Sequence, residues 1–125
     1  MKTSKRKDHK SRKWLRKKAW DLQSEYIRRV EGGKCFTCLA KKNWKEMQSG
    51  HFVHGDSMDF IKKNIHCQCP RCNKWLRGNL GVYASELEKH YGYGIVQELL
   101  GLKDKIIIYK TKELEDLIIY YQRKL

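Results

Sequence analysis

Residues 35–38 read Cys-Phe-Thr-Cys and residues 69–73 read Cys-Pro-Arg-Cys-Asn, and the fold is organised around these two short motifs. Two Cys-x-x-Cys motifs separated by a few dozen residues are the usual means of holding one tetrahedral zinc ion in four thiolates. A chain of 125 residues has room for only a modest core, and a structural zinc contributes on the order of 10 kcal/mol to folding in small zinc peptides. We therefore predict one structural zinc, bound by Cys35, Cys38, Cys69 and Cys72.

The fifth cysteine, Cys67, lies two residues before Cys69. The 69/72 spacing forms the turn of a zinc knuckle and the 67/69 spacing does not, so Cys67 is expected to be a small buried apolar residue. The odd number of cysteines and the lack of a secretion signal argue against a disulfide framework, and they favour a reducing cytoplasm.

The formal net charge of +14 indicates a polyanionic partner. Nucleic acid is the first choice, because cationic side chains neutralise phosphates and release counterions. An anionic membrane surface is a weaker choice, since the sequence has no long apolar run and no lipidation signal. We therefore expect nucleic-acid binding and no membrane association.

The pattern of the chain predicts an α+β fold in one domain with an appended arm. The N-terminal helix has apolar positions at multiples of four between about Ser11 and Glu31, and Ser11 is its predicted cap. The predicted regions are a basic flexible arm over 1–13, a basic helix over 14–34, a zinc-stapled core over 35–80 and a helical part over 81–125.

Within the core, strands are predicted at 50–54 and 60–68, followed by a helix from Pro70 through Leu76. In the C-terminal part, a helix ending at Gly101 precedes a β-prone run at 106–109, which is either a strand or a buried extended link. A last helix, capped by Thr111 and running to Leu125, carries an apolar stripe that is either core packing or a dimer seam.

Two features between and after the knuckles go beyond a structural zinc site. Histidines lie on an apolar run, Gly50-His51-Phe52-Val53-His54, and Asn73 directly follows the last cysteine. This layout resembles the ββα-metal nucleases of the HNH, or His-Me finger, type. In those enzymes a β-hairpin carries a histidine and the following helix carries a metal ligand. The resemblance implies a small ββα-metal core, stapled by zinc and flanked by α-helices.

Phosphodiester hydrolysis at such a site needs a base that activates water and a divalent cation that stabilises the developing charge. His51 is the first choice for the base, and Asn73 offers a carbonyl oxygen to Mg²⁺ or Mn²⁺. In a regular strand His54 would face away from His51, but a bend at Gly50 or Gly55 would bring both to one cation. The alternative in which His51 is a metal ligand and His54 is the base therefore stays open.

Asn64 is expected to be structural, with its amide pinning the hairpin through backbone hydrogen bonds. Basic side chains flank the site and follow the N-terminal helix, where they would position a nucleic-acid backbone without reading its sequence. Recognition of DNA shape is therefore favoured. The residues predicted to contact nucleic acid are Arg12, Arg16, Lys17, Lys62, Lys63, Arg71, Lys74 and Arg77.

One family matches more closely than the general HNH pattern. The chain resembles the lambdoid phage NinG recombination proteins over roughly residues 20–100, and its knuckles and Cys-Asn element are also similar to the phage endonuclease VII resolvases. The residues that carry the NinG resemblance include Gly50-His51-Phe52, Asn64, Gln68-Cys69, Cys72-Asn73, Trp75-Leu76 and Gly78-Asn79.

The NinG resemblance implies zinc at the four cysteines, a magnesium-type catalytic ion bound by Asn73, and His51 as the catalytic histidine. It also implies cleavage of branched intermediates such as Holliday junctions, D-loops or forks in the host cytoplasm. Many HNH sites carry an acidic ligand just before the catalytic histidine, where this chain has Gly50. The residue that completes the catalytic-metal site is therefore left open.

Two functions from different classes follow. The first is a metal-dependent, structure-specific DNA endonuclease, expected to be a homodimer because resolving a four-way junction needs two symmetric cuts. The alternative is a non-catalytic zinc-knuckle DNA-binding protein in which His51 is only structural. RNA is an alternative substrate, because the charge pattern does not distinguish it from DNA.

Overall fold

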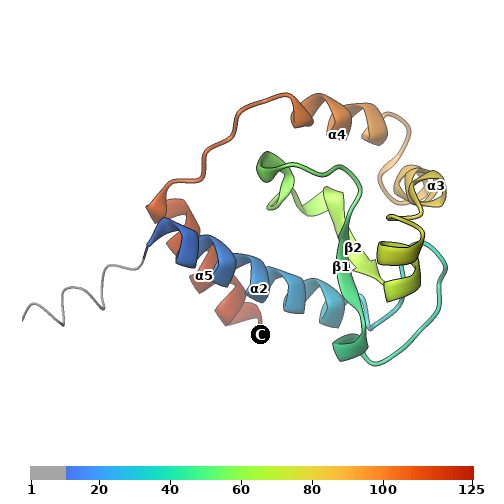
Figure 1. Cartoon of the computed structure of the whole chain (residues 1–125), viewed down its shortest axis with the longest axis horizontal. Helices are drawn as coiled ribbons and strands as arrows, with labels where there is room; N and C mark the ends of the chain where they lie inside the picture. Colours follow the sequence, from blue (N-terminus) through green and yellow to red (C-terminus); the bar gives the residue numbers. More distant parts are fainter. Residues whose placement is uncertain (1–10) are drawn as a thin grey trace, which may run out of the picture. The chain divides into compact units, whose positions relative to one another are not determined.

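A computed structural model describes residues 11–125, so the predicted arm lies outside the described residues over positions 1–10. The protein is α+β, as predicted. It divides into two compact units, residues 11–26 with 108–125, and residues 27–107. The elements in Figure 1 are α2 (Arg12–Val30), η1 (Trp44–Glu46), β1 (Gln48–His51), η2 (Asp56–Met58), η3 (Lys62–Asn64), β2 (Ile65–Gln68), η4 (Arg71–Trp75), α3 (Leu80–Tyr91), α4 (Ile95–Lys103) and α5 (Thr111–Lys124).

The first unit pairs the start of α2 with α5. Ser11 caps α2 as predicted, because its Oγ accepts a hydrogen bond from the backbone N–H of Trp14 at 3.1 Å. Tyr121 of α5 is buried, donates its hydroxyl to Gln23 Oε1 at 3.1 Å, and places its ring 5.5 Å from that of Tyr26. At Tyr121 the apolar stripe of the last helix therefore serves core packing, one of its two predicted roles.

The second unit is built around the antiparallel hairpin of β1 and β2, with Gly50 opposite His66 and Gln48 opposite Gln68. The helix α3 is tied to this hairpin, because the buried hydroxyl of Tyr83 donates to the carbonyl oxygen of Gly50 at 2.7 Å. Around that contact lies an apolar core of Phe36, Phe52, Val53, Met58, Tyr83, Leu87, Ile95 and Leu99.

The strand bounds predicted at 50–54 and 60–68 were wrong. β1 ends at His51 because a side chain replaces the strand ladder beyond it. The fully buried Asn64 accepts from the backbone N–H of Val53 at 2.8 Å and donates to the carbonyl of Val53 at 3.0 Å and of Met58 at 3.3 Å. The chain before β2 is a 3-10 turn, η3, and the strand itself starts only at Ile65.

The helix predicted from Pro70 through Leu76 is instead the five-residue π-helix η4 followed by a turn. The backbone N–H of Leu76 reaches back to the carbonyl of Arg71 at 2.9 Å, the spacing of a π-helix. Left-handed backbone at Arg77, Gly78 and Asn79 then closes the segment.

Three C-terminal predictions were also wrong in detail. The β-prone run 106–109 is neither a strand nor buried, because it has no regular secondary structure and Ile106 and Ile108 are exposed. The helix expected to end at Gly101 continues to Lys103. Thr111 is the first residue of α5, and the flanking N–H of Lys110 is capped by Glu113 Oε1 at 3.0 Å.

Substituting Asn64 tests its role in holding the hairpin. Asn64→Ala leaves the buried backbone groups of Val53 without partners, which should cost on the order of 3 kcal/mol in the free energy of unfolding. Urea unfolding followed by circular dichroism measures this. The matched control is Asn43→Ala, which removes an exposed cap at Lys45 N and should cost at most about 1 kcal/mol. Equal losses in the two variants would contradict the role of Asn64.

Candidate metal centre and active site

The four predicted zinc ligands come together in the structure. The Sγ atoms of Cys35, Cys38, Cys69 and Cys72 all lie within 4.8 Å of one another, and those of Cys38 and Cys69 are 3.7 Å apart. Tetrahedral zinc with Zn–S bonds of about 2.3 Å requires neighbouring sulfurs about 3.8 Å apart. The donor set therefore fits a structural metal such as zinc.

Hydrogen-bond donors around the sulfurs suit them to be thiolates. The backbone N–H groups of Cys38 and Cys72 point at the Sγ atoms of Cys35 and Cys69, each at 3.5 Å. Burial alone would raise the pKa of Cys35, but bonds from the Cys38 N–H and the Thr37 hydroxyl outweigh it and lower that pKa to about 6. Burial and the neighbouring thiols raise the pKa of Cys38 to about 12. A bound metal would displace the proton that Cys38 holds.

Cys67 is fully buried but is not one of the four clustered thiols. Burial, reinforced by the nearby Glu31 carboxylate, raises the pKa of Cys67 to about 12. The same carboxylate accepts from the Cys67 backbone N–H at 3.0 Å and from His66 Nδ1 at 2.8 Å. Cys67 thus packs in the wall of the metal cluster, beside Met47.

The candidate catalytic histidine lies at the end of β1 and contacts an acid. His51 Nε2 is 3.0 Å from Asp59 Oδ1, and both side chains are mostly buried. The ring of His54 stacks on that of His51 with centroids 5.4 Å apart. His51 and His54 do not point to opposite faces as they would in a regular strand, because β1 ends at His51 and His54 lies in the loop that follows.

The amide of Asn73 lies beside the same strand, near Gly50. Its Nδ2 donates to Gln48 Oε1 at 2.7 Å, which turns Oδ1 toward Gly50. A Cβ at position 50 would lie 3.0 Å from this oxygen and would overlap Gln68 Oε1. The zinc knuckle fixes Asn73, because the Asn73 N–H donates to the carbonyl of Cys69 at 2.9 Å.

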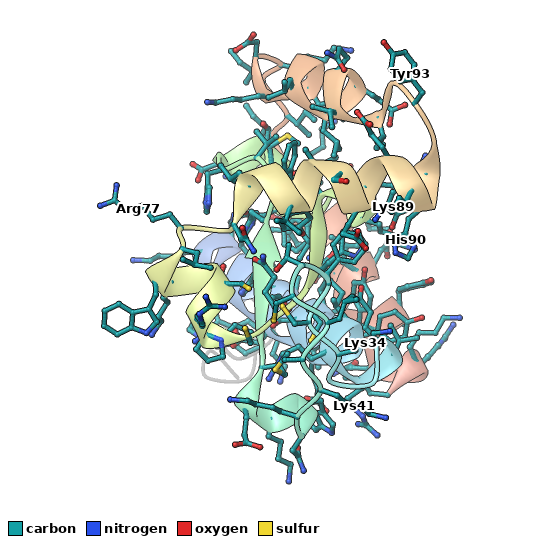
Figure 2. All side chains as sticks on the ribbon, turned by 90° about the vertical axis from the view of Figure 1, so that its right-hand side faces the viewer. Lys34, Lys41, Arg77, Lys89, His90 and Tyr93 are labelled. Atoms are coloured by element: carbon teal, nitrogen blue, oxygen red, sulfur yellow. The ribbon has the colours of Figure 1, made fainter. Side chains whose placement is uncertain are left out.

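The basic residues predicted to contact nucleic acid fall into both units. In the second unit, Arg71, Lys74 and Arg77 are exposed on η4 and its turn, and Figure 2 shows Arg77 projecting away from the ribbon. Lys62 and Lys63 are exposed on η3. In the first unit, Arg12 Nε donates to the backbone carbonyl of Tyr109 at 2.7 Å, and the Arg16 guanidinium lies 5.7 Å from the centroid of the Tyr109 ring. Lys17 forms an ion pair with Asp21 at 2.8 Å.

Asp59, Gln68 and Gly50 make contacts in this region that the sequence pattern did not predict. The contact of Asp59 with His51 depends on how the loop after β1 folds back. Gln68 and Gly50 meet only through the register of the hairpin. Trp75 is 82% exposed on η4, although a tryptophan in a predicted helix is more often packed. The feature of the sequence that could have indicated an exposed Trp75 is its cationic neighbours, Arg71, Lys74 and Arg77.

Comparison with known proteins gives a family but no individual relative. No helix within residues 11–125 is long and apolar enough to cross a membrane. No curated protein and no solved structure matches the chain. The family model described as Bacteriophage Lambda NinG protein matches residues 1–125. The match covers the whole chain, so the protein belongs to the NinG family.

Proposed function

We propose that this protein is a metal-dependent DNA endonuclease with a ββα-metal site of the HNH type, built from β1, β2 and η4. The observation that carries the proposal is the 3.0 Å contact between His51 Nε2 and Asp59 Oδ1 at the end of β1. The adjacent residue is Gly50, and the carbonyl oxygen of Asn73 lies over it. A base with an orienting acid and an oxygen ligand for a hard cation therefore share one short segment.

The chemistry that these groups support is hydrolysis of a phosphodiester. His51 takes a proton from water as the water oxygen attacks phosphorus, and the bond to the 3′ oxygen breaks. The leaving 3′ oxygen takes a proton from solvent, so the products are a 5′ phosphate and a 3′ hydroxyl. Asp59 holds the imidazole so that, in the neutral ring, the lone pair is on the nitrogen away from the acid. A divalent cation bound at Asn73, such as Mg²⁺ or Mn²⁺, would stabilise the charge that develops on the phosphate.

Branched DNA from phage recombination is the proposed substrate. The exposed cations of η4 and its turn, Arg71, Lys74 and Arg77, present positive charge beside Asn73 and contact phosphates without reading bases. A homodimer is proposed for four-way junctions, because one site per chain makes one cut and resolution needs two.

The proposal is tested by cleavage of end-labelled four-way junction, fork and linear duplex DNA with Mg²⁺, Mn²⁺ or EDTA. The expected result is metal-dependent cutting of the branched substrates, with two protein chains per junction by analytical ultracentrifugation. Tight binding without cutting under either metal would overturn the nuclease and leave the non-catalytic zinc-knuckle DNA-binding protein. Preferential cutting of structured RNA over DNA would overturn the choice of substrate alone.

Trp75 offers a stacking surface for an unpaired base at the branch. It is 82% exposed on η4, and base–aromatic stacking contributes about 1–3 kcal/mol per base. Trp75→Ala should therefore weaken binding to a forked DNA by about 5- to 150-fold and binding to plain duplex much less. Fluorescence anisotropy measures both dissociation constants.

The matched control for Trp75 is Tyr93→Ala. Tyr93 is 99% exposed and lies at a different edge of the view from Arg77 in Figure 2. Its removal should leave the dissociation constants unchanged. A Trp75→Ala protein that binds fork and duplex like the wild type would exclude the stacking role.

A further inference from the structure

The side-chain amide of Gln68 is locked in one orientation. Gln68 is fully buried, and its Nε2 donates to the carbonyl oxygen of Gly78 at 2.9 Å and to Thr37 Oγ1 at 3.2 Å. A carbonyl can only accept a hydrogen bond, so flipping the amide would place two oxygens against each other at Gly78. The direction in which Gln68 Oε1 points is therefore fixed.

That fixed oxygen is buried and unpaired. Among the described residues, Gln68 Oε1 is the buried side-chain polar atom for which the structure gives no hydrogen-bond partner. Leaving a buried acceptor unpaired costs about 1–3 kcal/mol. Such an atom in a well-packed strand indicates a partner of another kind, and for a carbonyl oxygen a hard cation is one such partner.

A second amide oxygen converges on the same place. The space that a side chain at position 50 would fill is taken by Gln68 Oε1, and Asn73 Oδ1 lies 3.0 Å from the Cβ position there. Asn73 is held in this orientation by its Nδ2 bond to Gln48. Two negative carbonyl ends thus face one backbone position, Gly50, and the absence of a side chain there is what gives them room.

Both amides are anchored to the zinc knuckles. Thr37, which accepts from Gln68, lies between Cys35 and Cys38, and the N–H of Gly78 donates to the carbonyl of Cys72 at 2.8 Å. The structural metal site therefore sets the positions of both oxygens. An oxygen held in this way is preorganised for a cation, because little side-chain entropy is lost on binding.

We propose that Gln68, through Oε1, is a ligand of the catalytic divalent cation together with Asn73, and that it replaces the acidic side chain that Gly50 lacks. This inference rests on the proposed function, since it names a ligand of the same site. Both ligands are neutral, so the phosphate of bound DNA supplies the missing negative charge. Mn²⁺ should accordingly bind more tightly in the presence of DNA, and DNA more tightly in the presence of Mn²⁺, by the same factor.

The test removes the oxygen ligand at position 68 and, in a second variant, supplies one at position 50 instead. The measured quantity is the dissociation constant of Mn²⁺. Loss of the free Mn²⁺ signal in electron paramagnetic resonance gives the dissociation constant, with zinc-loaded protein and uncleavable junction DNA. Gln68→Met keeps the side-chain length and removes the oxygen, and it should weaken Mn²⁺ binding at least about tenfold. Zinc content and the melting temperature report whether each variant is folded.

Two variants at position 50 test whether an acidic side chain there can replace Gln68 as the ligand. Gly50→Asp alone should fail to bind Mn²⁺, because its Cβ overlaps Gln68 Oε1. Gly50→Asp with Gln68→Ala frees that space for a carboxylate and should bind Mn²⁺ more tightly than the wild type and with less dependence on DNA. If Gln68→Met does not fold, this double variant decides alone.

Two results would overturn the inference. One is wild-type Mn²⁺ affinity in folded Gln68→Met, and the other is a folded double variant that binds no Mn²⁺. Neither outcome depends on cleavage. A wild-type protein that binds Mn²⁺ through Gln68 but cuts no nucleic acid would contradict the proposed nuclease activity and would still support the cation site.

Discussion

Cys72→Ser should abolish metal binding and unfold the unit formed by residues 27–107. A serine hydroxyl is not a thiolate and cannot complete the four-sulfur set. The cluster joins the loop at Cys35 and Cys38 to the end of β2 and the start of η4, and the buried residues around it are otherwise Met47 and Cys67. This end of the unit has few apolar contacts to replace a metal.

The expected size of this effect is large compared with the stability of a small domain. A structural zinc contributes on the order of 10 kcal/mol, and whole domains are stable by about 5–15 kcal/mol. Zinc content by mass spectrometry and thermal unfolding by circular dichroism measure the loss. The control is Cys67→Ala, a buried cysteine outside the four-thiol set, which should keep one zinc per chain. Zinc-free, normally melting Cys72→Ser protein would contradict a structural metal.

The metal cluster was predictable from sequence because its chemistry is local. Each Cys-x-x-Cys motif forms its own turn, with the N–H of Cys38 or Cys72 directed at the first sulfur of its pair. Spacing alone therefore identified the four thiols and set Cys67 apart. The helix α2 was equally accessible, since its apolar spacing of four and its cap at Ser11 lie within one segment.

The hairpin was harder to predict because its bounds depend on contacts between distant residues. Asn64 was expected to bond to the hairpin backbone, but no local pattern indicates that it does so at Val53, 11 positions away in sequence, where it ends the strand ladder. Gly50 and Gln68 meet because Gln48 pairs with Gln68, and a shift of one residue would turn every side chain to the other face. The sequence shows that position 50 lacks an acidic side chain, but it does not show that Gln68 Oε1 occupies that space.

His51→Ala should reduce cleavage of branched DNA by about 10²- to 10⁴-fold, the usual contribution of a general base. The His51 side chain is not one of the residues of the apolar core, so the melting temperature and zinc content should change little. Affinity for the junction should also persist, because the cations of η4 are untouched. Single-turnover cleavage rates and junction binding, measured on the same preparations, separate these effects.

Two further variants assign the roles of the neighbouring groups. Asp59→Asn removes the charge that orients His51 at 3.0 Å but keeps the side chain, so cleavage should fall by less than in His51→Ala. His54→Ala removes the stacked ring and should lower the rate only modestly if His51 is the base. A loss in His54→Ala as large as that in His51→Ala, together with weaker Mn²⁺ binding in His51→Ala, would reverse the two roles. His51 would then be the cation ligand and His54 the base, because only a ligand changes the metal affinity of the resting protein.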